Sequence, residues 1–326
     1  MIEQERSALR REGHYLGTGM LLLLMAMQLT FTMVLIPLQL LGAVNPADPS
    51  HYMGLGNTGF LLLYAGVYAF AMGVPFVAVD AAFRRHTHPF RPSKWPGAVT
   101  AVLYVTAGLG ICIFANLAAS RLLQILSVFG IQQPDLPSYL EGTGLSLILN
   151  IFVMALLPAL LEEMVFRGYV LQALRPYGDG TAIVVSSLLF ALMHGNVAQT
   201  PFAFIVGLAC ATVVIRTHCI WLACAVHFLN NLMSVLLDYA TRNMTAGDQQ
   251  LVLISVFLLL SLAGLAAALL QNHRETAAPP PGNAAAPCSL TWKAKASALL
   301  SSPPFLLCLL FSLMLIALHT VGGGLT

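Results

Sequence analysis

Apolar runs long enough to cross a bilayer recur from one end of the chain to the other. Most of them hold about 20 residues or more, which is the length that a helix needs to span the hydrocarbon core. Because lipid offers no partner to free backbone groups, such runs fold as helices. We expect about nine spans, over residues 17–44, 57–83, 96–120, 145–175, 181–194, 201–215, 220–239, 251–270 and 296–319.

The composition agrees with a membrane setting. Hydrophobic residues make up 58% of the 326 residues and charged residues only 9%, whereas soluble domains carry roughly 25% charged residues. A net charge of +2 gives no basis for binding nucleic acid. The sequence therefore predicts an all-α, polytopic membrane bundle in contact with membrane lipids, with its chemistry in helices four to seven.

The orientation of the chain can be predicted from its basic residues. The first apolar run, 17–44, is longer than the roughly 7 to 15 apolar residues of a signal peptide, so we interpret it as a retained span. With nine spans, all of the 15 Lys and Arg residues except Arg121 and Arg242 fall on the side of the N-terminus. Because short basic loops stay in the cytoplasm, we expect a multi-pass protein with a cytoplasmic N-terminus.

Changes in composition divide the chain into three predicted parts. Residues 1–144 hold N-terminal helices and connectors, 145–240 a catalytic core, and 241–326 C-terminal helices. Within the last part, the Pro/Ala-rich stretch 276–287 is predicted to be a flexible linker. The Pro- and acid-containing segment 121–144 is predicted to lie at or outside the membrane interface. The six cysteines lack CxxC spacing, which favours free, buried thiols.

The fourth span carries Glu162, Glu163 and Arg167 in an otherwise apolar helix. Ionisable side chains at membrane depth are costly, and they commonly mark function. Glu163 and Arg167 lie four residues apart with the acid first, which is the favourable order for an ion pair on a helix. Because Arg167 pairs with Glu163, Glu162 has no basic partner on this helix and is the candidate for catalysis.

The turn around Gly178 makes the fourth and fifth spans an antiparallel hairpin. Glu162 lies sixteen residues before Gly178, and His194 lies sixteen residues after it. At about 1.5 Å per residue, both are about 24 Å from the turn, so their side chains can meet. A glutamate and a histidine that share a water molecule form a general-base arrangement for hydrolysis.

The seventh span adds His227 and Asn231, four residues apart on one helix face. An imidazole and a carboxamide side by side can donate two hydrogen bonds to a developing oxyanion. Straight, upright helices would leave His227 about 10 Å from His194 in depth. A broken, tilted or re-entrant element near Gly195–Pro201 would be needed to bring the two histidines to the same depth.

Three motifs follow one another within about seventy residues. They are Glu162-Glu163-x-x-Phe166-Arg167-Gly168, Phe190-x-x-x-His194 and His227-x-x-x-Asn231. In order and spacing they resemble the motifs of the CAAX protease and bacteriocin-processing family. That family includes type II CAAX prenyl endopeptidases and bacterial immunity or lysostaphin-resistance-like membrane proteins. The resemblance covers about residues 145–239.

The resemblance implies an intramembrane endopeptidase that acts on a membrane-held substrate, either a CAAX-type prenylated protein or another peptide. Glu162 and His194 would activate the water, while His227 and Asn231 would stabilise the oxyanion. The supporting residues would be Glu163, Arg167 and Phe190, the last through packing.

Members of this family have been described both as metalloproteases and as metal-independent glutamate peptidases. The chain has no HExxH motif, but Glu162, His194 and His227 could together ligate zinc with a water. We favour no metal and no other cofactor, because Asn231 is a poor zinc ligand and a good oxyanion donor.

Each motif also admits a role without catalysis, and so does the whole chain. The acids and the arginine of the fourth span could snorkel to the interface, His194 could end a helix, and polar groups of the seventh span could join helices. A non-enzymatic immunity or peptide-binding scaffold would keep the fold, and a transporter would use the buried acid and histidine to carry protons. The complete catalytic set favours the peptidase, and no inverted repeat supports a transporter.

Overall fold

The computed structural model describes residues 2–45, 47–48, 52–90, 95–128, 144–276 and 288–322. Within these ranges the regular structure is entirely helical. Eight helices are long and apolar enough to cross a membrane, and Asp179–Met193 is a shorter apolar helix. The predicted all-α membrane bundle is therefore confirmed, with the fifth predicted span as its short member.

The elements follow the predicted spans closely. They are α1 (Ile2–Leu40), α2 (Gly56–Ala82), α3 (Ala98–Val128), α4 (Gly144–Asn150), η1 (Ile151–Leu156), α5 (Leu157–Glu163), η2 (Met164–Val170), α6 (Leu171–Leu174), η3 (Arg175–Tyr177), α7 (Asp179–Met193), α8 (Gln199–Thr217), α9 (Ile220–Thr241), α10 (Ala246–Thr276), α11 (Trp292–Leu300) and α12 (Pro303–Gly322).

The predicted fourth span is one continuous run that changes its helical type. Segments α4, α5 and α6 alternate with the π-helical segments η1 and η2, and the run ends in the 3-10 turn η3. Pro158, in the first turn of α5, has no N–H to donate to the preceding turn, and η1 ends just before it. Both glutamates thus lie in a short α-helical stretch between two π-helical segments, which are frequent at functional sites.

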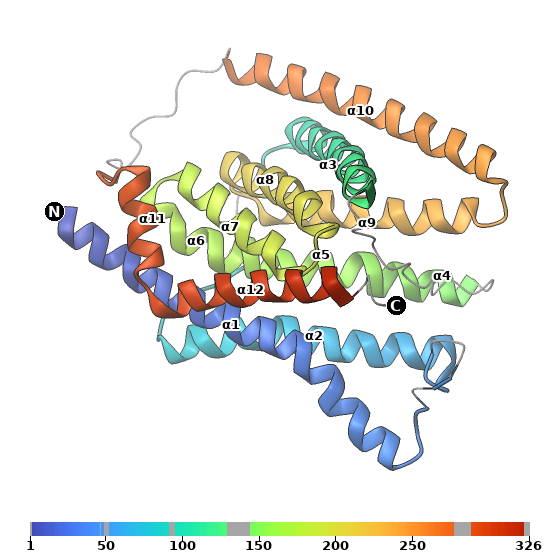
Figure 1. Cartoon of the computed structure of the whole chain (residues 1–326). Coiled ribbons are helices and arrows are strands. Elements are labelled where there is room, and N and C mark those ends of the chain that lie inside the picture. Colours follow the sequence, from blue (N-terminus) through green and yellow to red (C-terminus); the bar gives the residue numbers. More distant parts are fainter. Residues whose placement is uncertain are drawn as a thin grey trace.

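The bundle has three layers (Figure 1). Helices α1, α2 and α12 form one outer layer, α3 and α10 form the other, and the segments from α5 to α9 lie between them. Glycines allow the closest approaches within the outer layers. A Cβ on Gly264 of α10 would lie 2.5 Å from Cα of Gly110 in α3, so these two helices touch through their backbones.

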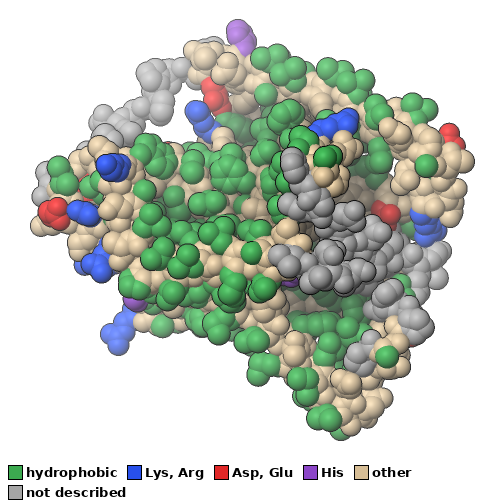
Figure 2. Space-filling view, viewed as in Figure 1, with side chains coloured by type: hydrophobic (Ala, Val, Ile, Leu, Met, Phe, Trp, Pro, Cys, Tyr) green, Lys and Arg blue, Asp and Glu red, His purple; other side chains and the backbone are tan. Residues whose placement is uncertain are grey.

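The surface of the molecule fits a bilayer. In Figure 2, hydrophobic side chains cover the sides of the helices, and charged side chains gather towards the two ends of the bundle. Large apolar side chains such as Leu258 and Leu262 of α10 are more than half exposed. The chain is an integral membrane protein.

Several predicted boundaries were wrong. Helix α1 begins at Ile2 and not at residue 17, and α10 runs over Ala246–Thr276 and not over 251–270. The ninth predicted span, 296–319, is two helices, because Pro303 and Pro304 cannot continue α11 and the chain turns at Ser301. The third span continues to Val128, so the first part of the segment predicted at or outside the interface is helical. The remainder of that segment, 129–143, lies outside the described residues, as does 277–287 of the predicted linker. All six cysteines are free, as predicted, and all but Cys288 are buried.

Candidate active site

The predicted ion pair between Glu163 and Arg167 is present at the centre of the bundle. Nε of Arg167 lies 3.1 Å from Oε2 of Glu163, and neither side chain is more than 1% exposed. Nη2 of Arg167 donates to the carbonyl of Gly207 at 3.1 Å, and the guanidinium lies 4.6 Å from the ring centre of Phe190. The arginine is therefore held by α5, α7 and α8 together.

Gly207 makes this arrangement possible. A Cβ at this position would lie 2.9 Å from Cβ of Ser187, so α7 and α8 approach too closely here for any other residue. The bare backbone of Gly207 packs on α7 while its carbonyl accepts the hydrogen bond from Arg167.

The same glutamate orients His227. Oε1 of Glu163 lies 2.9 Å from Nδ1 of His227. An ionised carboxylate only accepts hydrogen bonds, so Nδ1 carries a proton and donates it to Glu163. The other ring nitrogen, Nε2, lies 3.9 Å from Oε2 of Glu162. An oxygen atom between these two groups can lie about 2.8 Å from each, within hydrogen-bond distance of both.

The second oxygen of Glu162 is held by a residue that the sequence analysis missed. The hydroxyl of Tyr68, on α2, donates to Oε1 of Glu162 in the interior. Tyr68 stacks on Tyr64, with ring centres 6.0 Å apart. A pair of tyrosines four residues apart in an apolar span was the only signal in the sequence, and it did not indicate a partner 94 residues away.

His194 is the residue that follows α7, where it ends the helix. Its Nδ1 lies 3.0 Å from the carbonyl of Phe190, which can only accept, so Nδ1 carries the proton and Nε2 the lone pair. The ring of Phe190 lies between the two histidines, 5.1 Å from that of His194 and 5.9 Å from that of His227. The packing role predicted for Phe190 therefore extends to both imidazoles.

The structure separates Glu162 from His194 more than the hairpin argument suggested. Within the part of the chain that the structure describes, no hydrogen bond or ion pair joins these two side chains, and the imidazole beside Glu162 is that of His227. The chain turns at Gly195, whose φ is +63°, before α8 begins at Gln199.

Asn231 lies one helical turn beyond His227 on α9 and is half-buried. Its carboxamide oxygen accepts a hydrogen bond from the Nδ2 group of Asn230 at 3.1 Å. With the oxygen engaged, the NH2 group of Asn231 is the part left for a ligand. This is the donor that an oxyanion needs.

The donor set does not fit a metal centre well. Among the described residues, no three His, Cys, Asp or Glu side chains are grouped closely enough to hold a metal ion. Oε1 of Glu162 accepts from Tyr68 and Nδ1 of His227 is bound to Glu163, so the atoms left facing each other are Oε2 of Glu162 and Nε2 of His227. These two atoms fall short of the three protein ligands of a catalytic zinc site. We derive no step through a metal.

Taken together, these features define a helical membrane protein with an ionisable centre buried in the middle of its bundle. Residues 144–233 match the family model described as type II CAAX prenyl endopeptidase Rce1-like. This match confirms the resemblance to the CAAX protease family seen in the three motifs. The match covers less than a third of the chain. No curated protein and no solved structure matches it.

Removing the central arginine should destabilise the fold. We expect Arg167→Ala to cost about 3–5 kcal/mol, because it leaves the buried carboxylate of Glu163 without its partner. Thermal unfolding in nanodiscs measures the loss, and Glu163→Gln in the same chain should recover part of it. The control is Arg175→Ala, which breaks a pair with Asp179 whose side chains are 31% and 55% exposed and should cost at most about 1 kcal/mol. Equal stability of the two single variants would contradict the structural role of Arg167.

Proposed function

We propose that the protein is an intramembrane endopeptidase that hydrolyses a peptide bond of a membrane-held substrate with a water activated by Glu162 and His194. The observation that carries this proposal is the buried carboxylate of Glu162, whose Oε2 lies 3.9 Å from Nε2 of His227 with room for an oxygen atom between them. The role of His194 rests on its motif and on the lone pair of its Nε2. The match of residues 144–233 to a peptidase family supports it.

In the proposed reaction, the carboxylate of Glu162 and Nε2 of His194 take the proton of the attacking water. Both groups suit this role, since Glu162 is an acceptor and the Nδ1–H of His194 is already donated to the carbonyl of Phe190. The water oxygen attacks the scissile carbonyl and the C–N bond then breaks. The proton held by the base passes to the leaving amine, so that charge and atoms balance.

The oxyanion formed in this step requires donors. The NH2 group of Asn231 is one of them. His227 provides the other in its doubly protonated form, because its Nδ1–H is donated to Glu163 and only a second proton makes Nε2 a donor. Arg167 and Glu163 support the imidazole in this scheme.

The substrate of the proposed enzyme is a peptide or lipidated protein held at the membrane, with CAAX-type prenylated proteins as one class. We propose that the N-terminus is cytoplasmic, as the distribution of basic residues indicates. The competing hypothesis is a non-enzymatic immunity or peptide-binding scaffold. It differs from the peptidase in predicting no new protein termini.

Neutralising Glu162 should remove activity without unfolding the protein. We expect Glu162→Gln and His194→Ala each to lower kcat by about 10²–10⁴-fold, and the double variant to be little worse, because the two residues act on one proton transfer. Mass spectrometry of new protein termini in membranes of expressing cells identifies the cleavages. The matched control is Glu275→Gln, since Glu275 also accepts from a tyrosine hydroxyl, that of Tyr104, but lies at the end of α10.

The outcome of this comparison separates the two hypotheses. Termini that appear with wild type and with Glu275→Gln, and disappear with Glu162→Gln, would establish the peptidase. Identical termini for all variants at matched expression would favour the scaffold. Additive losses in the double variant would show that Glu162 and His194 do not act as one unit.

Tyr68 should act as a positioning residue through Glu162. Tyr68→Phe removes only the hydroxyl, so we expect kcat to fall by about tenfold with KM close to wild type. The variant should also lose about 1–3 kcal/mol of stability, because one oxygen of the buried Glu162 carboxylate loses its donor. The control is Tyr64→Phe, which changes the neighbouring stacked ring. A rise in KM with unchanged kcat, or an equal effect of both variants, would argue against positioning of the Glu162 carboxylate.

The proposed reaction needs no metal. Activity of the purified protein in nanodiscs should therefore persist after incubation with a strong zinc chelator, because glutamate, histidine and asparagine side chains supply each step. Element analysis of the chelated sample provides the control for complete removal. Loss of activity that added zinc restores would show that the water is activated by a metal instead.

A further inference from the structure

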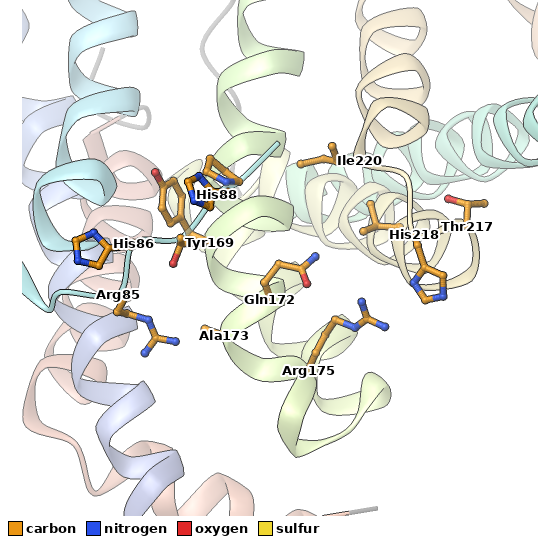
Figure 3. A pocket seen from close by; sticks show the side chains of 13 residues that line it. Arg85, His86, His88, Tyr169, Gln172, Ala173, Arg175, Thr217, His218 and Ile220 are labelled. Atoms are coloured by element: carbon orange, nitrogen blue, oxygen red, sulfur yellow. The ribbon is translucent and has the colours of Figure 1, made fainter. Parts of the chain in front are cut away.

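A cavity of about 720 Å³ opens at one end of the bundle, away from the residues proposed for catalysis. Figure 3 shows it between three parts of the chain: the connector that follows α2, the end of the catalytic helical run, and the turn from α8 to α9. Its volume falls within the roughly 300–1,000 Å³ of cavities that bind small molecules.

The lining of this cavity is basic. Arg85, His86 and His88 come from the connector, Arg175 from η3 and His218 from the turn before α9, whereas no Asp or Glu is among the described residues that line it. In Figure 3 Arg85 and His218 lie on opposite sides, with Arg175 between them. A ligand in this cavity would meet donors from three directions.

Arg85 and Arg175 each form one ion pair, and each keeps further N–H groups that can donate to a ligand. Nη1 of Arg85 lies 2.7 Å from Glu12, and Nε of Arg175 lies 3.5 Å from Asp179. Each guanidinium has five N–H groups, and these pairs engage one nitrogen of each. The two side chains are 29% and 31% exposed, so their other donors remain accessible to a ligand.

Aromatic side chains indicate the depth of this cavity. Trp221, one residue after the lining residue Ile220, is 48% exposed and stacks on Phe90 of the connector with ring centres 5.0 Å apart. Exposed tryptophans are typical of the headgroup region of a membrane. Basic pockets between membrane helices at this depth bind anionic lipid headgroups.

We propose that this cavity binds a phosphate group, carried by an anionic lipid headgroup or present as free phosphate. A tetrahedral phosphate offers oxygens to donors on several sides, as the spread of Arg85, Arg175 and His218 requires. A planar carboxylate is instead satisfied by the two parallel hydrogen bonds of one guanidinium.

The position of the cavity links the ligand to the catalytic helix. Pro89 of the connector packs so closely on Gly168 of η2 that a Cβ there would lie 2.4 Å from the proline side chain. Gly168 directly follows Arg167. A ligand held by Arg85 of the connector or by Arg175 of η3 therefore binds beside the packing of the connector on the segment that holds the central ion pair.

The test is a binding measurement on the full chain, independent of any cleavage. Native mass spectrometry from nanodiscs of phosphatidylcholine, with and without phosphatidylglycerol, measures retained lipid. Thermal unfolding in phosphatidylcholine nanodiscs, with inorganic phosphate added at constant ionic strength, measures binding of the free anion. The variants are Arg175→Gln and His218→Asn, the latter chosen because asparagine tolerates the φ of +54° at this position. The control is Arg216→Gln, which removes an exposed charge of α8 outside the cavity.

The proposal predicts that Arg175→Gln and His218→Asn each weaken binding by about tenfold, and that Arg216→Gln leaves it unchanged. Selective retention of phosphatidylglycerol by the wild type would identify a lipid headgroup, and stabilisation by inorganic phosphate would identify the free anion. No response to either probe would overturn the proposal. Equal weakening by Arg216→Gln, or binding unaffected by both cavity variants, would overturn it too. If one cavity variant does not fold, the other decides.

Discussion

The buried ion pair between Arg167 and Glu163 is the interaction on which the central layer of the bundle depends. A charge at this depth is tolerated only when it is paired and hydrogen-bonded. Arg167 meets this requirement through Glu163, the carbonyl of Gly207 and the ring of Phe190. Because these partners come from α5, α8 and α7, one guanidinium fixes three helices relative to each other.

The geometry of the candidate site depends on the second oxygen of Glu163, the one that does not face Arg167. Glu163 has two oxygens, of which one meets Arg167 and the other accepts from Nδ1 of His227. The ion pair therefore determines which nitrogen of His227 faces Glu162. His194 is oriented by a different device, the carbonyl of Phe190 at the end of α7. In both histidines Nδ1 is bound to an acceptor, a carbonyl for His194 and a carboxylate for His227. The proposed roles, base for His194 and oxyanion donor for His227, therefore differ because only His227 lies beside the two glutamates.

What the sequence could predict here was local. Glu163 and Arg167 are four residues apart on one helix, so their contact follows from helical geometry. The spans followed from the hydropathy of the sequence alone. Hydropathy does not register a break between two apolar helices, so α11 and α12 were predicted as one span although Pro303 and Pro304 lie between them. The hairpin placed Glu162 and His194 at similar depth, and it treated the helices as straight. The π-helical segments around the glutamates and the turn at Gly195 depend on packing, and no periodicity in the sequence encodes them.

Residues outside the matched segment contribute to the candidate site. The matched residues, 144–233, contain both glutamates, both histidines and Asn231. One oxygen of Glu162 is nevertheless bound by Tyr68 of α2, and Gly168 is covered by Pro89 of the connector. Both partners precede the matched segment by many residues. The N-terminal helices thus complete the environment of Glu162 and Arg167, so a fragment limited to the matched residues would lack a hydrogen bond to the proposed base and the packing that covers the helix beside it.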